Sequence, residues 1–111
     1  MSVFPFEADK LALQYLKRRS MPKNDIEKQA VLLRVLNHFD ERKYTEQEVN
    51  NILMDLFDDH VTVRRDLISF NYMQRDPLKG IYWVIKRDFT LEDIKKSSWL
   101  TKQAENLRMK L

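Results

Sequence analysis

The sequence predicts a mostly helical α+β domain with a single β-hairpin. Apolar residues recur with the period of an α-helix along most of the chain, and the period changes to that of a strand at about residue 72. One Gly and three Pro in 111 residues leave little room for long loops. A chain of this length can bury one core but not two, so we expect a single domain over residues 1–111.

Residues 7–19 and 25–39 predict the first two helices. Acidic side chains come first and basic ones last in residues 7–19, which suits the helix dipole. Pro22 ends this helix, because the residue before a proline avoids the α region. We expect Asp25 to cap the second helix. Its apolar residues cover more than one face, which indicates a central core helix.

Two further helices, at 46–57 and 60–71, are predicted to form a helix-turn-helix. Thr45 and Glu48 have the spacing of a capping box at the start of the first one. Asp59 is a good N-cap for the second. The short break between them is typical of the helix-turn-helix motif.

A β-hairpin is predicted next, with strands at 72–76 and 81–86 and a turn that contains Gly80. A helix pair followed by a hairpin is the order of a winged helix-turn-helix, here with its core at 22–85. An extra helix is expected at each end. The last one, within 90–111, carries an apolar stripe of Leu100, Ala104, Leu107 and Leu111.

One combination of residues in this core is specific: Tyr44-Thr45-Glu46, Glu48-Val49-Asn50, Asp59, Arg64-Arg65, Gly80 and Tyr82-Trp83. It resembles the uncharacterised bacterial family called domain of unknown function 2087, over roughly residues 22–85. The resemblance implies a transcriptional regulator, because members occur alone or joined to helix-turn-helix repressor domains. The chain departs from the pattern before Pro22, where Gly is usual. It also departs at Asn71, where Asn tolerates the left-handed conformation that Gly would adopt.

Several classes of function are disfavoured by what the sequence lacks. Without Cys, the chain has no disulfide framework, thiolate zinc site or cysteine nucleophile. His38 and His60 have no partner at metal-ligand spacing, and no glycine-rich phosphate loop occurs. No signal peptide is recognisable, and no apolar run approaches the roughly 18 residues of a membrane span. We therefore expect a cytoplasmic protein without metal, cofactor, membrane contact or enzymatic activity.

The charge pattern and the helix periodicity select candidate residues for binding nucleic acid. Residues 40–60 carry two basic and seven acidic side chains, whereas residues 61–90 carry six basic and three acidic ones. On a helical wheel Arg64 falls among apolar neighbours, so we expect it to be structural and paired with a carboxylate such as Glu48 or Asp58. Arg65 falls on the opposite side. The candidates on that side, facing a major groove, are Thr62, Arg65 and Ser69.

Basic residues in and after the hairpin are candidates for phosphate contacts: Arg75, Lys79, Lys86 and Arg87. Asp58 and Asp59 argue against DNA at the start of the second helix. Tyr82 and Trp83 alternate along the strand, so one is expected to face the core and the other to face outward.

Two functions remain open from the sequence. The first is a DNA-binding transcriptional regulator that binds duplex DNA as a homodimer, with the C-terminal helix forming much of the contact. The second is a protein-interaction module that keeps the winged-helix shape without binding DNA, as the acidic 40–60 segment would allow. The C-terminal helix has its own alternative, in which it folds back onto the first two helices and leaves a monomer.

Overall fold

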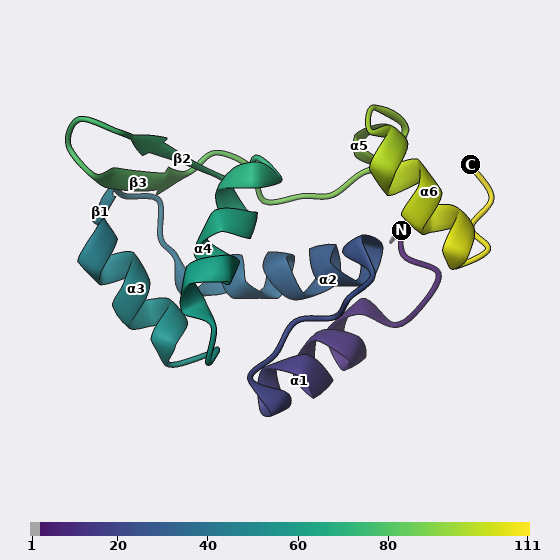
Figure 1. The fold of residues 1–111 in the computed structure, drawn as a ribbon, viewed down its shortest axis with the longest axis horizontal. Helices are drawn as coiled ribbons and strands as arrows, with labels where there is room; N and C mark the ends of the chain where they lie inside the picture. Colours follow the sequence, from purple (N-terminus) through teal and green to yellow (C-terminus); the bar gives the residue numbers. More distant parts are fainter. Residues whose placement is uncertain (1–2) are drawn as a thin grey trace.

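A computed structural model describes residues 3–111 as an α+β fold of six α-helices, one 3-10 turn and a three-stranded antiparallel sheet (Figure 1). In chain order the elements are α1 (Ala8–Arg18), α2 (Asp25–Val35), η1 (Leu36–His38), β1 (Tyr44–Thr45), α3 (Glu46–Met54), α4 (His60–Ser69), β2 (Met73–Asp76), β3 (Ile81–Val84), α5 (Leu91–Lys95) and α6 (Ser98–Asn106). The first four helices and the hairpin lie where the sequence predicts them, with ends a few residues shorter.

Local caps begin α3 and α4 as predicted. The Thr45 hydroxyl accepts from the backbone N–H of Glu48 at 3.1 Å, and the Glu48 carboxylate accepts from the Thr45 N–H at 2.9 Å. Asp59 accepts from the Thr62 N–H at 3.2 Å. The prediction that Asp25 caps α2 is wrong. Asn24 is the cap, and its side chain accepts from the N–H groups of Ile26 and Glu27, because Asp25 already lies in the first turn.

A third strand, β1, was not predicted. It has two residues and pairs antiparallel with β3, with Tyr44 opposite Tyr82 and Thr45 opposite Ile81, so that the strand order is β1-β3-β2. Two residues are too few to show a period of 2, which explains why the sequence pattern does not reveal it. Pairing with β3 attaches the hairpin to the start of α3.

The main core lies where α2, α3, α4 and the sheet meet. Its largest fully buried members are Leu32, Leu36, Phe39, Tyr44, Leu53, Phe57, Leu67, Tyr72, Met73 and Tyr82. Gln29 is the one buried polar residue among the described residues, and it accepts from the Tyr72 hydroxyl at 2.6 Å. That bond satisfies both polar groups, which would otherwise be costly to bury. Burial raises the pKa of the Tyr72 hydroxyl.

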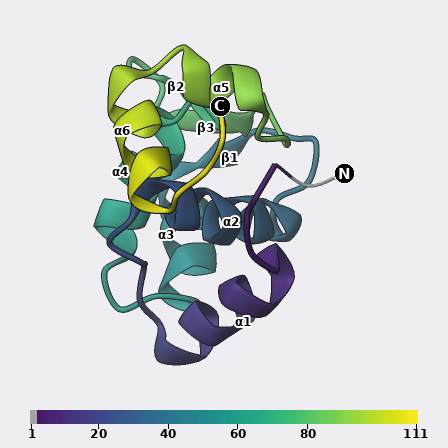
Figure 2. The same ribbon diagram turned by 90° about the vertical axis from the view of Figure 1, so that its right-hand side faces the viewer.

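The C-terminal segment is two helices, α5 and α6, where one helix over 91–110 was predicted. The Ser97 side chain caps α6 by accepting from the Leu100 N–H at 3.1 Å, so the chain turns between the two helices. Ile94, Leu100 and Ala104 are buried with Ile26 of α2 in a second core. The ribbon of α6 passes beside α2 there (Figure 2). The apolar stripe therefore folds back onto α2, and its buried members cannot form a contact between subunits. No helix within residues 3–111 is long and apolar enough to cross a membrane.

We expect Leu53→Ala to lower the free energy of unfolding by about 2–5 kcal/mol, because Leu53 is fully buried in the main core. Asp59→Ala removes only an exposed cap and should cost about 1 kcal/mol. Denaturant midpoints of the two variants measure the difference. Equal, small losses would contradict the placement of α3 against the core.

We expect Ile94→Ala to cost about 2–5 kcal/mol as well, because Ile94 is fully buried against α2. Trp99 of α6 is 54% exposed and makes a hydrogen bond from its indole N–H to Asp25 Oδ2, so Trp99→Ala should cost only about 1 kcal/mol. Thermal unfolding of both variants tests whether the C-terminal helices belong to the folded unit. If Ile94→Ala unfolded like the unmodified protein, α5 would not be part of the core.

Candidate nucleic-acid interface

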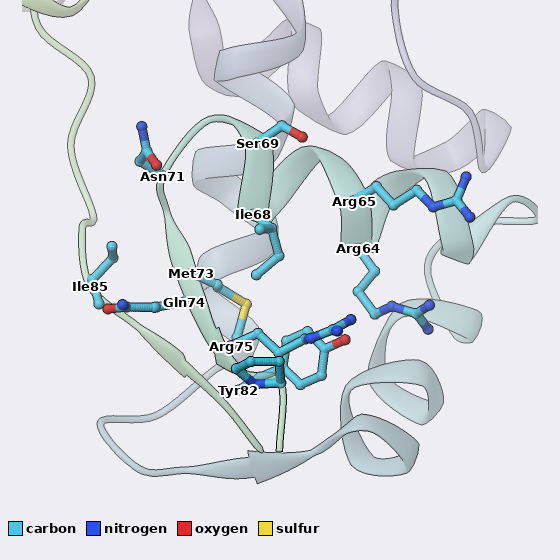
Figure 3. A pocket seen from close by; sticks show the side chains of 11 residues that line it. Arg64, Arg65, Ile68, Ser69, Asn71, Met73, Gln74, Arg75, Tyr82 and Ile85 are labelled. Atoms are coloured by element: carbon cyan, nitrogen blue, oxygen red, sulfur yellow. The ribbon is translucent and has the colours of Figure 1, made fainter. Parts of the chain in front are cut away.

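The outer side of α4 and the β2–β3 hairpin enclose a groove of about 680 Å³ (Figure 3). Its eleven lining residues are Arg64, Arg65, Ile68, Ser69, Asn71, Met73, Gln74, Arg75, Pro77, Tyr82 and Ile85. Three of them are arginines and none is acidic. The groove wall is therefore positively charged, although it belongs to a chain with nearly balanced charges.

The end of α4 determines how the hairpin faces the helix. Asn71 has a φ of +64°, which is the left-handed conformation that ends many helices. The N–H of Asn71 donates to the carbonyl of Ile68 and the N–H of Tyr72 to the carbonyl of Leu67, each at 3.0 Å. The chain reverses there, so β2 returns beside α4 and both contribute to one groove (Figure 3).

Arg64 is held against α3. Its side chain is only 18% exposed, its guanidinium donates to Asn50 Oδ1, and it lies 3.8 Å from Glu46 Oε1. Glu46 Oε1 also accepts from the Tyr82 hydroxyl at 2.8 Å. Glu46 and Asn50 lie one turn apart on α3, and both reach Arg64.

The carboxylates expected to pair with Arg64 have other partners. Glu48 lies 3.3 Å from Arg42, and Asp58 lies 2.8 Å from Arg19. The hydrogen bond from the Thr45 backbone N–H, together with Arg42, lowers the pKa of Glu48. Arg64 was expected to pair with a carboxylate. That carboxylate is Glu46, and not Glu48 or Asp58, the two examples named.

Arg65 and Arg75 are the exposed arginines of the groove. Neither side chain makes a hydrogen bond or ion pair with any residue of the described chain. Two exposed polar residues also line the groove, Ser69 on α4 and Gln74 on β2. Two unpaired guanidinium groups, one from α4 and one from β2, are therefore available to a ligand in this groove.

The other predicted candidates are distributed differently. Thr62 lies at the start of α4 and not among the groove-lining residues, and its hydroxyl donates to Asp59 Oδ2 at 2.7 Å. This bond, with that of the Thr62 N–H, lowers the pKa of Asp59. Lys79 is exposed in the hairpin turn, two residues after the groove residue Pro77.

Lys86 and Arg87 lie apart from the groove and are engaged within the chain. Lys86 Nζ is 2.7 Å from Asp93 Oδ2 and 3.3 Å from Asp88 Oδ1. Arg87 pairs with Glu41 at 2.6 Å and donates to the carbonyls of Leu36 and Phe39. These contacts join the segment after β3 to the end of α2 and to α5. Lys86 and Arg87, which the sequence offered as candidates for phosphate contacts, are therefore not part of the candidate interface.

Sequence reasoning missed the part played by Arg19. It lies just after α1 with a φ of +54°, and its guanidinium pairs with Asp58 and donates to the carbonyls of Met54 and Asp55. The acidic turn before α4, which argued against DNA, thus has a cation bound to it. No local pattern signals this contact, since the partners lie 35 to 39 residues away.

We expect Arg64→Ala to lower the melting temperature, with a loss of about 1–3 kcal/mol, because Asn50 and Glu46 lose their partner. Arg65→Ala should leave the melting temperature unchanged, since Arg65 is exposed and unpaired. Thermal unfolding of the two variants decides this. The reverse result would mean that α4 is rotated by about one residue.

Comparison with known proteins identifies the family. Residues 17–84 match the family model described as "Uncharacterized protein conserved in bacteria (DUF2087)". No curated protein and no solved structure matches the chain. The match covers 68 of the 111 residues, and it includes Arg64, Arg65 and Arg75 of the groove. The chain therefore belongs to this bacterial family of uncharacterised proteins.

Proposed function

We propose that this protein is a DNA-binding transcriptional regulator of the winged-helix type, in which α4 is the recognition helix and the β2–β3 hairpin is the wing. The observation that carries this proposal is the groove between α4 and the hairpin, whose lining residues include three arginines and no carboxylate. Duplex DNA is a polyanion whose binding depends on such cations. The order of a helix pair followed by a hairpin supports the winged-helix reading.

The contacts suggest different roles for the three arginines. Arg65, exposed beside Ser69 on α4, has the free planar guanidinium that pairs well with a guanine edge in the major groove. Arg75 on β2, with Lys79 in the turn, is placed to contact phosphates beside the groove. Arg64 is positioned by Asn50 and Glu46, so it meets a ligand with less loss of side-chain entropy.

A homodimer remains part of the proposal, because one recognition helix reads few base pairs and regulators commonly pair two half-sites. Its contact has to come from a surface other than the α6 stripe, since Leu100 and Ala104 are buried within the chain. The proposed contact between subunits is therefore no longer assigned to the apolar stripe of α6.

The second candidate is a protein-interaction module on the same scaffold, without catalysis or DNA binding. Exposed acidic residues favour it: Asp40 and Asp55 form no ion pair with any residue of the described chain. They lie on the segment with five more acidic than basic side chains. A basic protein surface would complement that segment, whereas DNA would be repelled by it.

We expect the protein to bind mixed-sequence duplex DNA with an affinity that falls steeply as salt rises, because arginine–phosphate contacts release counterions. Arg65→Ala and Arg75→Ala should each weaken binding. A phosphate-contacting residue contributes about 1 to the slope of log affinity against log salt, so the slope should fall by about that amount in Arg75→Ala. Fluorescence anisotropy over a series of salt concentrations measures both quantities.

Lys102→Ala is the matched control. Lys102 is an exposed cation of α6, a helix that does not line the groove and lies at the other end of the molecule from the hairpin (Figure 1). Its loss changes the net charge equally and should leave binding nearly unchanged. Absence of binding by the unmodified protein at low salt would defeat the proposal. If Arg65→Ala, Arg75→Ala and Lys102→Ala weakened binding equally, the groove would not be the DNA-binding site.

A further inference from the structure

The tip of the hairpin presents a leucine to solvent. Leu78 is 95% exposed, whereas the next most exposed large apolar side chain of the described residues, Trp99, is 54% exposed. Pro77 and Lys79, on either side of it, are exposed as well. The turn therefore ends in an apolar side chain that contacts almost nothing in its own chain.

This turn is held in one conformation by several bonds. Asp76 Oδ1 accepts from the N–H of Leu78 at 3.0 Å and from that of Lys79 at 3.3 Å. The Asp76 carbonyl accepts from the Gly80 N–H at 2.9 Å. Gly80 has a φ of +63°, which favours glycine at the last position of the turn. The position of the leucine is thus fixed by its own turn.

The turn is also anchored to the start of α3. The Glu46 N–H at the start of α3 donates to the Gly80 carbonyl at 3.2 Å, next to the pairing of β1 with β3. The tip therefore has a set position relative to α4, which lies on the other side of the groove (Figure 3). A preorganised tip loses little conformational entropy when it binds.

We infer that Leu78 is an apolar wedge that enters the minor groove of duplex DNA, beside the major groove that receives α4. This inference rests on the function proposed above. Proteins that bind the minor groove insert residues such as Leu and Pro between base steps and flank them with cations. Here Arg75 and Lys79 flank the tip, and neither side chain is paired within the described chain.

Charge favours DNA over a protein as the partner of this tip. The two cations closest to Leu78 in the chain, Arg75 and Lys79, would complement the negative charge of a duplex. The one carboxylate of the turn, on Asp76, accepts from two backbone N–H groups of the turn itself. Insertion of the leucine would unstack a base step and bend the duplex.

The test compares Leu78→Ala with the unmodified protein on a short duplex that carries a fluorescence donor and acceptor at its ends. The unmodified protein should shorten the end-to-end distance. Leu78→Ala should bind about tenfold more weakly and lose this bend, because a buried leucine contributes much more than alanine. Its salt slope should be unchanged, since an apolar contact releases no counterions, whereas Arg75→Ala should lower the slope.

Two further variants serve as controls. The Leu78→Met variant should still bend the duplex, because Met is also apolar and has a similar volume. Leu13→Ala removes another exposed leucine, on α1, and should change neither binding nor bending. All the variants should melt at nearly the same temperature as the unmodified protein, because the altered side chains are exposed.

The outcomes separate the inference from the proposed function. Salt-dependent binding with the same affinity and bend in Leu78→Ala would overturn the wedge and leave the DNA-binding proposal standing. In that case a protein partner would be the better explanation for the exposed side chain of Leu78. No binding of the duplex by the unmodified protein would overturn both.

Discussion

The arrangement of the groove depends on residues 44–46, which join the helix pair to the hairpin. Tyr44 and Thr45 pair with β3, and α3 begins at the next residue under the Thr45 cap. The backbone of Glu46 then bonds to Gly80, and its carboxylate accepts from Tyr82 and faces Arg64. One short stretch thus contacts α4 and the hairpin as well as forming the start of α3. Without it, the hairpin would lose its backbone attachment to the start of α3 and would be held only by the burial of Tyr72, Met73 and Tyr82 in the core.

The basic residues of this chain serve two different purposes. Arg19 and Arg87 each combine a carboxylate partner with backbone carbonyls at the end of a helical segment, where the helix dipole favours a cation. These arginines hold α1 to the α3–α4 turn and the segment after β3 to the end of α2. Arg65 and Arg75 have no such partners, and both lie in the groove. The small net charge of +3 is therefore a poor guide to the surface, because the paired and unpaired cations lie in different places.

The C-terminal helices extend the domain beyond the part that matches the family, which ends at residue 84. They cover Ile26 of α2 and bury Ile94 and Ala104 there, in a core separate from the one beneath α4. Lys86 contributes by pairing with Asp93 at the start of α5. A small domain gains stability from each apolar face that it covers. This extension lies at the end of the molecule away from the hairpin (Figure 1), and none of its residues lines the groove.

The sequence by itself determined the elements whose signals lie within one turn of helix or one hairpin. The Thr45 and Asp59 caps, the turn at Gly80, the alternation of Tyr82 and Trp83 along β3 and the exposure of Arg65 all follow from neighbours close in the chain. Only the tertiary structure decided the rest. β1 is too short to have a period, and the α6 stripe would suit a partner subunit as well as α2. Lys86, Arg87 and Arg75 look alike in sequence, yet the first two meet carboxylates and the third does not. Which cation stays free depends on the segments that pass beside it, and these are far away in the chain.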